Sequence, residues 1–177
     1  MRSRKVIRGE FDSEMTPAPR ERKTKTAKQA LQSLERLCAR SEKSTGDAMR
    51  LMRTWGVPEA ERQGVLDTLI AARYIDNRRY AEAYTREKSQ LSGWGERKIA
   101  LKLREKGIER ETINAVLAPL REDETKAERL QTKLERKLHS VKAANDYELR
   151  GKLLRYALSL GYEYDTAMEC IDRIVER

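Results

Sequence analysis

The side chains most able to do chemistry in this chain are basic, and they fall close together along it. Guanidinium and ammonium groups bind phosphates and carboxylates, so this set predicts a surface that contacts DNA or an acidic protein, with an affinity that falls as salt rises. A lysine- and arginine-rich helix face is also commonly a plain solvated surface, and the spacing leaves both interpretations open. The set comprises Arg79, Arg86, Arg97, Lys98, Lys102 and Arg104.

Side chains suited to catalysis or metal binding are scarce. His139 is the only histidine, and it lies in a polar connection. Cys38 and Cys170 each fall within an apolar helical stripe, which predicts two buried free thiols. The Gly-Trp-Gly sequence at residues 93–95 lacks the preceding strand and the third glycine of a nucleotide-binding loop, so we expect a tight turn there. The chain is therefore predicted to be non-enzymatic, without cofactor or metal.

Composition favours several small cores over one thick core. Charged and hydrophobic residues each make up 38% of the 177 residues, and aromatic residues only 6%. The formal charge of +9 is concentrated in two segments, residues 1–26 and 73–120. No run of about 18 apolar residues is present, and the N-terminus leads into no apolar stretch, so we expect a cytoplasmic protein without a membrane span.

Three glycines mark an internal repeat. Gly56, Gly107 and Gly161 are each followed by a large apolar residue, and they are spaced by 51 and 54 residues. The ninth, tenth and thirteenth residues after each glycine are also apolar. This agreement predicts one supersecondary unit copied three times, with each glycine ending a helix.

Helical apolar spacing continues through the rest of the chain, and strand-like alternation is absent. The fold class is predicted to be all-α, an elongated tandem array of three three-helix repeats. The first repeat, residues 27–72, has helices near 27–40 and 46–55 and a third that starts at Pro58. The second, residues 73–120, has helices near 77–91, 95–106 and 109–118. The third, residues 121–177, has helices near 122–138, 146–160 and 165–176. Residues 1–26, with Pro17 and Pro19, are predicted to be a flexible basic tail.

The same periodicity predicts which side chains face inward. Ile70 is expected beside Val65, Leu66 and Leu69 in the first repeat, and Leu91 beside Tyr80, Ala81 and Tyr84 in the second. Leu101 falls on the polar side of its helix, where it either seals a junction between repeats or contacts a partner. Trp94 is the best exposed candidate for stacking on a nucleic-acid base, and Trp55 is expected in the core.

The second repeat also carries a specific set of motifs. A Tyr-x-Asp-Asn-x-x-Tyr-Ala pattern precedes a glycine turn, and Leu-x-x-Lys-Gly-Ile closes the next helix. From Tyr74 to Leu117 the chain resembles the RecX family of recombination regulators. Asn77 and Tyr80 differ from the commonest family residues, aspartate and phenylalanine; we expect Asn77 still to cap a helix. These residues are expected to act in packing and helix termination: Tyr74, Asp76, Asn77, Tyr80, Ala81, Gly95, Ile99, Leu103, Lys106, Gly107 and Ile108.

The resemblance implies a regulator that binds the RecA recombinase, chiefly as its filament on DNA, and limits its recombination, ATPase and co-protease activities. Such a protein would act in DNA repair, homologous recombination and the SOS response. An alternative is that the repeats are helix-turn-helix-like modules that bind single- or double-stranded DNA directly. A scaffold for another acidic protein is a third possibility. A monomer is expected, because no heptad seam is present.

Overall fold

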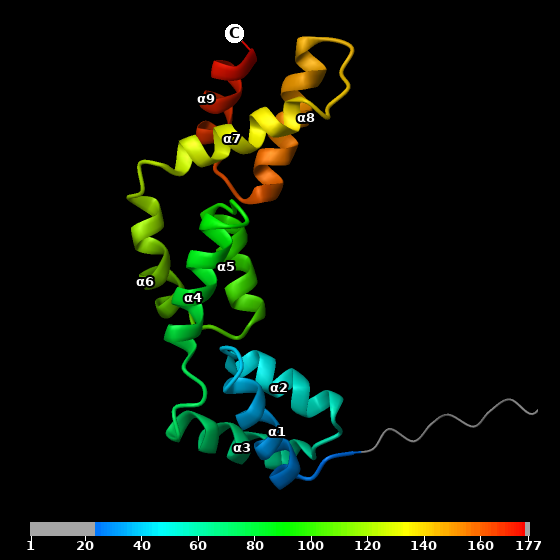
Figure 1. Ribbon diagram of the computed structural model, residues 1–177, viewed down its shortest axis with the longest axis vertical. Coiled ribbons are helices and arrows are strands. Elements are labelled where there is room, and N and C mark those ends of the chain that lie inside the picture. Colours follow the sequence, from blue (N-terminus) through cyan, green and yellow to red (C-terminus); the bar gives the residue numbers. More distant parts are fainter. Residues whose placement is uncertain (1–23, 176–177) are drawn as a thin grey trace, which may run out of the picture.

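The chain folds as an elongated column in which three groups of helices are stacked one on the next (Figure 1). The computed structural model describes residues 24–175, so most of the predicted tail lies outside the described residues. Within that range the chain forms nine helices and no strand, and its buried side chains gather in three separate hydrophobic clusters. The prediction of an all-α tandem array of three-helix repeats is confirmed.

The first unit packs α1 (Ala27–Cys38), α2 (Thr45–Thr54) and α3 (Glu59–Ala71) around Leu34, Met52 and Leu69. Thr26 begins α1 with a capping box that it shares with Gln29, and the Ser44 hydroxyl accepts a hydrogen bond from the amide of Asp47 at 3.1 Å to begin α2. These caps satisfy amides that a helix start otherwise leaves unbonded. Trp55 is half-buried against the core, as its sequence position indicates.

The second unit contains α4 (Asn77–Gln90), α5 (Glu96–Glu105) and α6 (Arg110–Arg121). The motif side chains Tyr80, Ala81, Ile99, Leu103 and Ile108 all lie in its hydrophobic cluster. These side chains therefore pack in the core of the second unit.

The third unit contains α7 (Lys126–Leu138), α8 (Asp146–Leu160) and α9 (Tyr164–Val175). The prediction that its first helix begins near residue 122 is wrong. Asp123 accepts hydrogen bonds from the amide and the hydroxyl of Thr125 at 2.8 and 2.7 Å, and this turn precedes α7. Short aspartate side chains compete in this way with helical hydrogen bonds.

The repeated glycines do end helices. The φ angles of Gly56, Gly107 and Gly161 are 68°, 75° and 90°, in the left-handed region that glycine tolerates best. The predicted boundaries between repeats, after residues 72 and 120, stay a prediction; Ile75, just beyond the first boundary, packs in the first cluster.

Two apolar side chains that were expected to face inward are exposed. Leu91 is 79% exposed and Ile70 is 44% exposed. Leu91 is the C-cap of α4, so the helical period that predicted its direction ends before it. The neighbouring Trp94 is half-buried instead, and it packs against both the second and the third clusters. Cys170 is buried, but Cys38 is only half-buried, so the expectation of two buried thiols is wrong for Cys38.

Candidate functional site: a basic face held by two junctions

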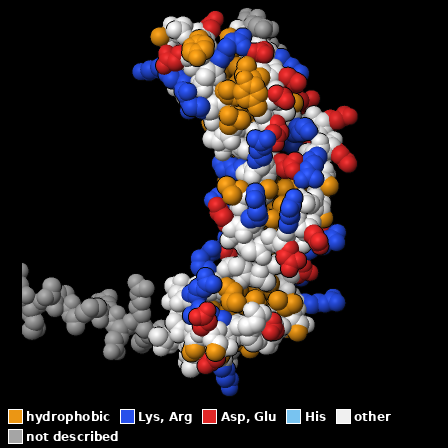
Figure 2. All heavy atoms as spheres, turned by 180° about the vertical axis from the view of Figure 1, so that it is seen from behind, with side chains coloured by type: hydrophobic (Ala, Val, Ile, Leu, Met, Phe, Trp, Pro, Cys, Tyr) orange, Lys and Arg blue, Asp and Glu red, His pale blue; other side chains and the backbone are white. Residues whose placement is uncertain are grey.

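Basic side chains lie among acidic ones along the whole column on the face drawn in Figure 2. The six predicted binding residues come from two helices of the second unit, with Arg79 and Arg86 on α4 and the other four on α5. Their surroundings divide them into residues that hold the units together and residues that face solvent.

Arg79 joins the second unit to the first. Its Nε donates to Glu42 Oε1 at 2.6 Å, and Glu42 lies in the connection between α1 and α2. A terminal nitrogen of the same guanidinium reaches the carbonyl of Arg73 at 3.3 Å. Arg79 is therefore largely engaged within the chain.

Arg97 and Lys98 join the second unit to the third. Arg97 forms an ion pair with Glu163, which directly precedes α9. Lys98 Nζ donates to the carbonyl of Ser159 at 3.0 Å and lies 4.4 Å from the centre of the Trp94 ring. Such a cation–π contact adds to the junction.

Arg86 and Arg104 are the most available members of the set. Both are exposed, and among residues 24–175 neither has a carboxylate within ion-pair distance. Lys102 pairs with Glu105 one helical turn away at 2.7 Å. The role of the six residues as a partner-binding surface stays a prediction, and Arg86 and Arg104 are its freest members.

The same kind of backbone hydrogen bond is found at both junctions. The amide of Gly46, in the first turn of α2, donates to the carbonyl of Lys106 at 3.1 Å. The amide of Gly95, the N-cap of α5, donates to the carbonyl of Leu160 at 2.8 Å. Each accepting carbonyl directly precedes a left-handed glycine, so the second helices of the three units follow one another head to tail. This geometry satisfies donors at a helix start with acceptors at a helix end.

Glycine is required at these contacts. A Cβ added to Gly46 would overlap the carbonyl oxygen of Lys106, and a Cβ added to Gly95 would overlap the carbonyl of Gly161. The glycine turn that resembles the family motif is thus explained by the close approach of two backbones.

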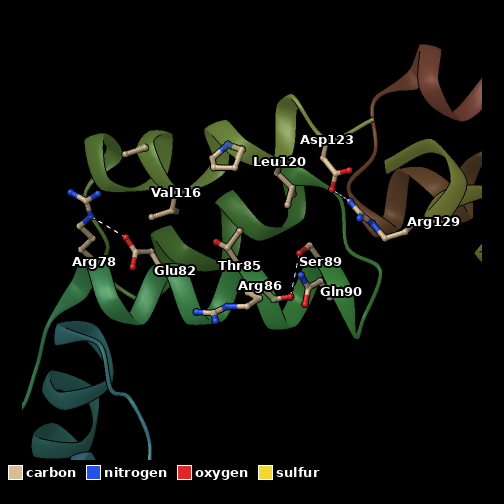
Figure 3. A pocket seen from close by; sticks show the side chains of 12 residues that line it. Arg78, Glu82, Thr85, Arg86, Ser89, Gln90, Val116, Leu120, Asp123 and Arg129 are labelled. Carbon is tan, nitrogen blue, oxygen red and sulfur yellow. Dashed lines mark hydrogen bonds and ion pairs between the residues drawn. The ribbon is translucent and has the colours of Figure 1, made fainter. Parts of the chain in front are cut away.

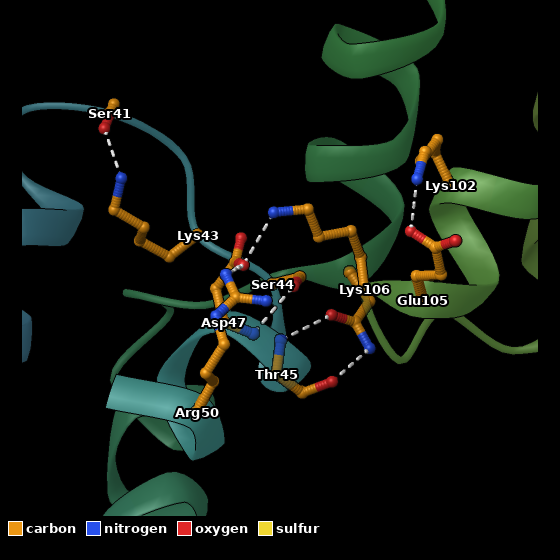
Figure 4. A network of polar contacts seen from close by, with 10 residues as sticks. Ser41, Lys43, Ser44, Thr45, Asp47, Arg50, Lys102, Glu105 and Lys106 are labelled. Carbon is orange, nitrogen blue, oxygen red and sulfur yellow. Dashed lines mark hydrogen bonds and ion pairs between the residues drawn. The ribbon is translucent and has the colours of Figure 1, made fainter. Parts of the chain in front are cut away.

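A partly buried ion pair reinforces the first junction. Lys106 Nζ lies 2.8 Å from Asp47 Oδ1, and Arg50 also pairs with this carboxylate (Figure 4). The side chain of Asp47 is 9% exposed. Burial alone would raise the pKa of Asp47, but the hydrogen bonds and charges of Lys106 and Arg50 outweigh it and lower the pKa. Asp47 therefore stays ionised near neutral pH.

The expectation that Asn77 caps its helix is wrong. Asp76 is the N-cap of α4 and accepts from the amide of Arg79 at 3.0 Å. Asn77 instead exchanges two hydrogen bonds with Thr45 of the first unit, each 3.0 Å long. The two residues are 32 positions apart, so no local sequence signal indicates this contact.

The aromatic and apolar candidates also have defined places. Trp94 is not an exposed stacking platform: its ring meets Tyr84 edge-on at 6.5 Å, and it is half-buried between two units. Leu101 is 49% exposed, which favours the partner-contact alternative over sealing a junction. Tyr74 is 38% exposed at the connection between α3 and α4.

His139 is the C-cap of α7 and is exposed. In the described part of the chain, no three histidine, cysteine or acidic side chains are grouped so that they could hold a metal ion. None of the helices between residues 24 and 175 has the combination of length and apolar character needed to cross a membrane.

Comparison with known proteins gives two matches to family models, and both fall on units described above. Residues 76–117 match the second three-helix domain of RecX, and residues 123–171 match the third. Together the two matches cover more than half of the chain. The chain belongs to the RecX family.

Curated relatives carry the same family name. The chain is 27% identical over 148 residues to "Regulatory protein RecX" of Clostridium botulinum strain Eklund 17B, covering 82% of this chain and 66% of the relative. It is 28% identical over 164 residues to the protein of that name from Mycolicibacterium smegmatis, covering 90% of this chain and 85% of the relative. These RecX relatives are named as regulators and not as enzymes.

Solved RecX structures share the fold. A crystal structure of regulatory protein RecX superimposes with a TM-score of 0.72 at 17% identity, over 85% of this chain and 72% of that one. RecX from Lactobacillus salivarius gives a TM-score of 0.66 at 20% identity, over 85% of this chain and 96% of that one. The column of three-helix units is thus the architecture of known RecX proteins.

Proposed function

We propose that this RecX-family chain binds the RecA recombinase, chiefly as its filament on DNA, and limits filament growth or activity. The proposal includes inhibition of recombination, ATP turnover and co-protease activity, and hence a role in DNA repair and the SOS response. Because such a filament forms on cytoplasmic DNA, the proposal places the chain in the cytoplasm as a non-enzymatic regulator.

The observation that carries the proposal is the head-to-tail column, in a chain whose family is named for regulation. Bonds from Gly46 and Gly95 fix each unit on the next, so the units present their outer faces at set intervals along one axis. A column of this kind can contact several protomers of a helical filament at once. Linked weak contacts of this sort gain strength through effective concentration.

Electrostatics supports the same partner class. Arg86 and Arg104 are exposed without ion-pair partners in the described region, and the second unit carries an excess of positive charge. Such charges steer a protein toward a polyanionic assembly and raise its association rate at low salt.

The test follows RecA bound to single-stranded DNA. Titrating the purified chain should lower both ATP turnover and DNA strand exchange. Replacing Arg86 and Arg104 by glutamate should move the titration to several-fold higher concentration. In the matched control, glutamate replaces Arg136 and Lys142, two exposed residues of the third unit, so the net charge changes by the same amount. Unchanged ATP turnover at a several-fold excess over filament sites contradicts the proposal.

Direct DNA binding is the second candidate function, and one observation favours it. Arg50, Arg53 and Arg104 line a shared hollow where the first and second units meet. A cluster of guanidinium groups suits the phosphates of a DNA backbone. A salt-dependent shift of bare DNA, undiminished without RecA, supports this function; no shift near physiological salt removes it.

A further inference from the structure

A groove of about 480 Å³ runs between α4 and α6 on the second unit (Figure 3). Its α6 wall is apolar and includes Val116, Pro119 and Leu120, and its α4 side carries Thr85 and Arg86. Apolar walls with a few polar groups are typical of sites that accept a ligand or a peptide side chain.

Thr85 in this groove has a hydroxyl that lacks a partner. The residue is 5% exposed, and within residues 24–175 its Oγ1 makes no hydrogen bond. Three other helical threonines of the chain donate to the carbonyl four residues earlier: Thr54 at 3.0 Å, Thr68 at 2.8 Å and Thr132 at 3.0 Å. Buried polar groups are normally satisfied, so this unpartnered hydroxyl in a residue that lines the groove lacks a bond that the free chain does not supply.

The charges at the rim also leave one group free. Arg78 pairs with Glu82 at 3.0 Å, and Arg129 pairs with Asp123 at 2.6 Å. Of the charged residues that line the groove, Arg86 alone has no ion pair among the described residues. An incoming carboxylate would therefore neutralise the one unpaired charge of the rim.

From these three features we infer that the groove between α4 and α6 binds a short extended segment of a partner protein that carries aliphatic side chains next to carboxylates. An aliphatic side chain packs on the α6 wall, a backbone or side-chain polar group bonds to the Thr85 hydroxyl, and a carboxylate pairs with Arg86. This site goes beyond the proposed regulation of RecA, because it is defined by the chemistry of the docked segment and its test needs no RecA.

The test uses a synthetic peptide, Gly-Leu-Glu-Leu-Asp-Gly with blocked ends, and backbone amide NMR shifts of the full chain. The peptide should produce saturable shifts at residues of α4 and α6 that line the groove. Its amide counterpart, Gly-Leu-Gln-Leu-Asn-Gly, should bind at least 5-fold more weakly, as expected when a charge-assisted hydrogen bond is lost. Shifts that are absent, or equal for the two peptides, overturn the inference.

Two substitutions locate the site. Arg86→Gln should weaken binding several-fold, while Arg104→Gln, on the other helix and outside the groove, should leave it unchanged. Equal effects of the two changes would point to a general charge effect and overturn the assignment. Amide NMR shifts of groove residues that change when the peptide-free chain is diluted would identify a second copy of the chain as the occupant. That result would also overturn the assignment.

Thr85→Val separates docking from a structural role. Valine keeps the shape of threonine and removes only the hydroxyl. Because that hydroxyl makes no bond in the free chain, the melting temperature should stay the same or rise, while peptide binding falls several-fold. A lower melting temperature with unchanged binding would assign Thr85 to structure and contradict the inference.

Discussion

The amide of Gly46 donates to the carbonyl of Lys106 at 3.1 Å, across the junction between the first and second units. Gly95 and Leu160 repeat this bond at 2.8 Å across the next junction. The repeat therefore extends beyond the three-helix units to the contact that stacks them.

Gly46→Ala should destabilise the first junction by about 1–3 kcal/mol, the usual cost of forcing an extra methyl group into a packed site. The added Cβ would overlap the carbonyl of Lys106. Gly64→Ala is the matched control. Gly64 lies inside α3, and a Cβ added there would meet no other atom within 4 Å, so the free energy of unfolding should rise by roughly 0.4–1 kcal/mol. Urea unfolding measures both changes. Equal free energies of unfolding for the two variants would show that the contact between Gly46 and Lys106 does not exclude a side chain at position 46.

Gly107→Val should destabilise the second unit by about 1 kcal/mol or more, because a β-branched residue resists a φ of 75°. Gly107→Asn should cost less, since asparagine tolerates the left-handed region better. Thermal unfolding followed by circular dichroism gives the melting temperatures of the two variants, and the valine variant should melt lower. If the valine variant melts at the wild-type temperature, Gly107 is not the helix stop described here.

Breaking the pair between Asp47 and Lys106 should cost about 1.5–3 kcal/mol, the range for a hydrogen bond to a charged group. Asp47→Asn and Lys106→Met together should cost less than the sum of the single changes, because the pair is lost only once. A double-mutant cycle in urea measures this coupling. Strict additivity would mean that the two side chains act independently.

Asp123 should make the chain sensitive to acid. Its pKa is lowered to about 2, first by the hydrogen bond from the Thr125 hydroxyl and then by Arg129. A folded pKa below the ordinary value of 3.8 adds stability above about pH 4, and this contribution disappears as the pH falls toward 2.

The wild type should thus have a higher free energy of unfolding in urea than Asp123→Asn at pH 6. The difference between the two should disappear near pH 2. Glu124→Gln, at the neighbouring exposed residue, serves as the control. A gap that persists unchanged at pH 2 would contradict the assignment to the Asp123 carboxylate.

Local signals in the sequence were sufficient to predict the helices and the core of each unit. Glycine spacing located the helix ends at Gly56, Gly107 and Gly161, and apolar periodicity located most of the buried side chains. The same periodicity failed for Leu91, because this residue follows the last turn of its helix.

Contacts between units could not be predicted from those signals. Arg79 and Arg97 look like surface residues in the sequence, and only the stacking of units places Glu42 and Glu163 against them. Asparagine commonly caps helices, yet the side chain of Asn77 bonds instead to Thr45 in another unit. Charge patterns therefore predicted a basic face but did not separate its free members from those in the junctions.

Co-sedimentation of the chain with RecA filaments measures the proposed binding itself. The chain should pellet with RecA assembled on single-stranded DNA, and much less with an equal amount of bare DNA. Replacing Arg86 and Arg104 by glutamate should reduce the pelleted fraction more than the matched replacement of Arg136 and Lys142. A chain that stays in the supernatant with filaments, or pellets equally with bare DNA, would show that it does not bind the RecA filament as proposed.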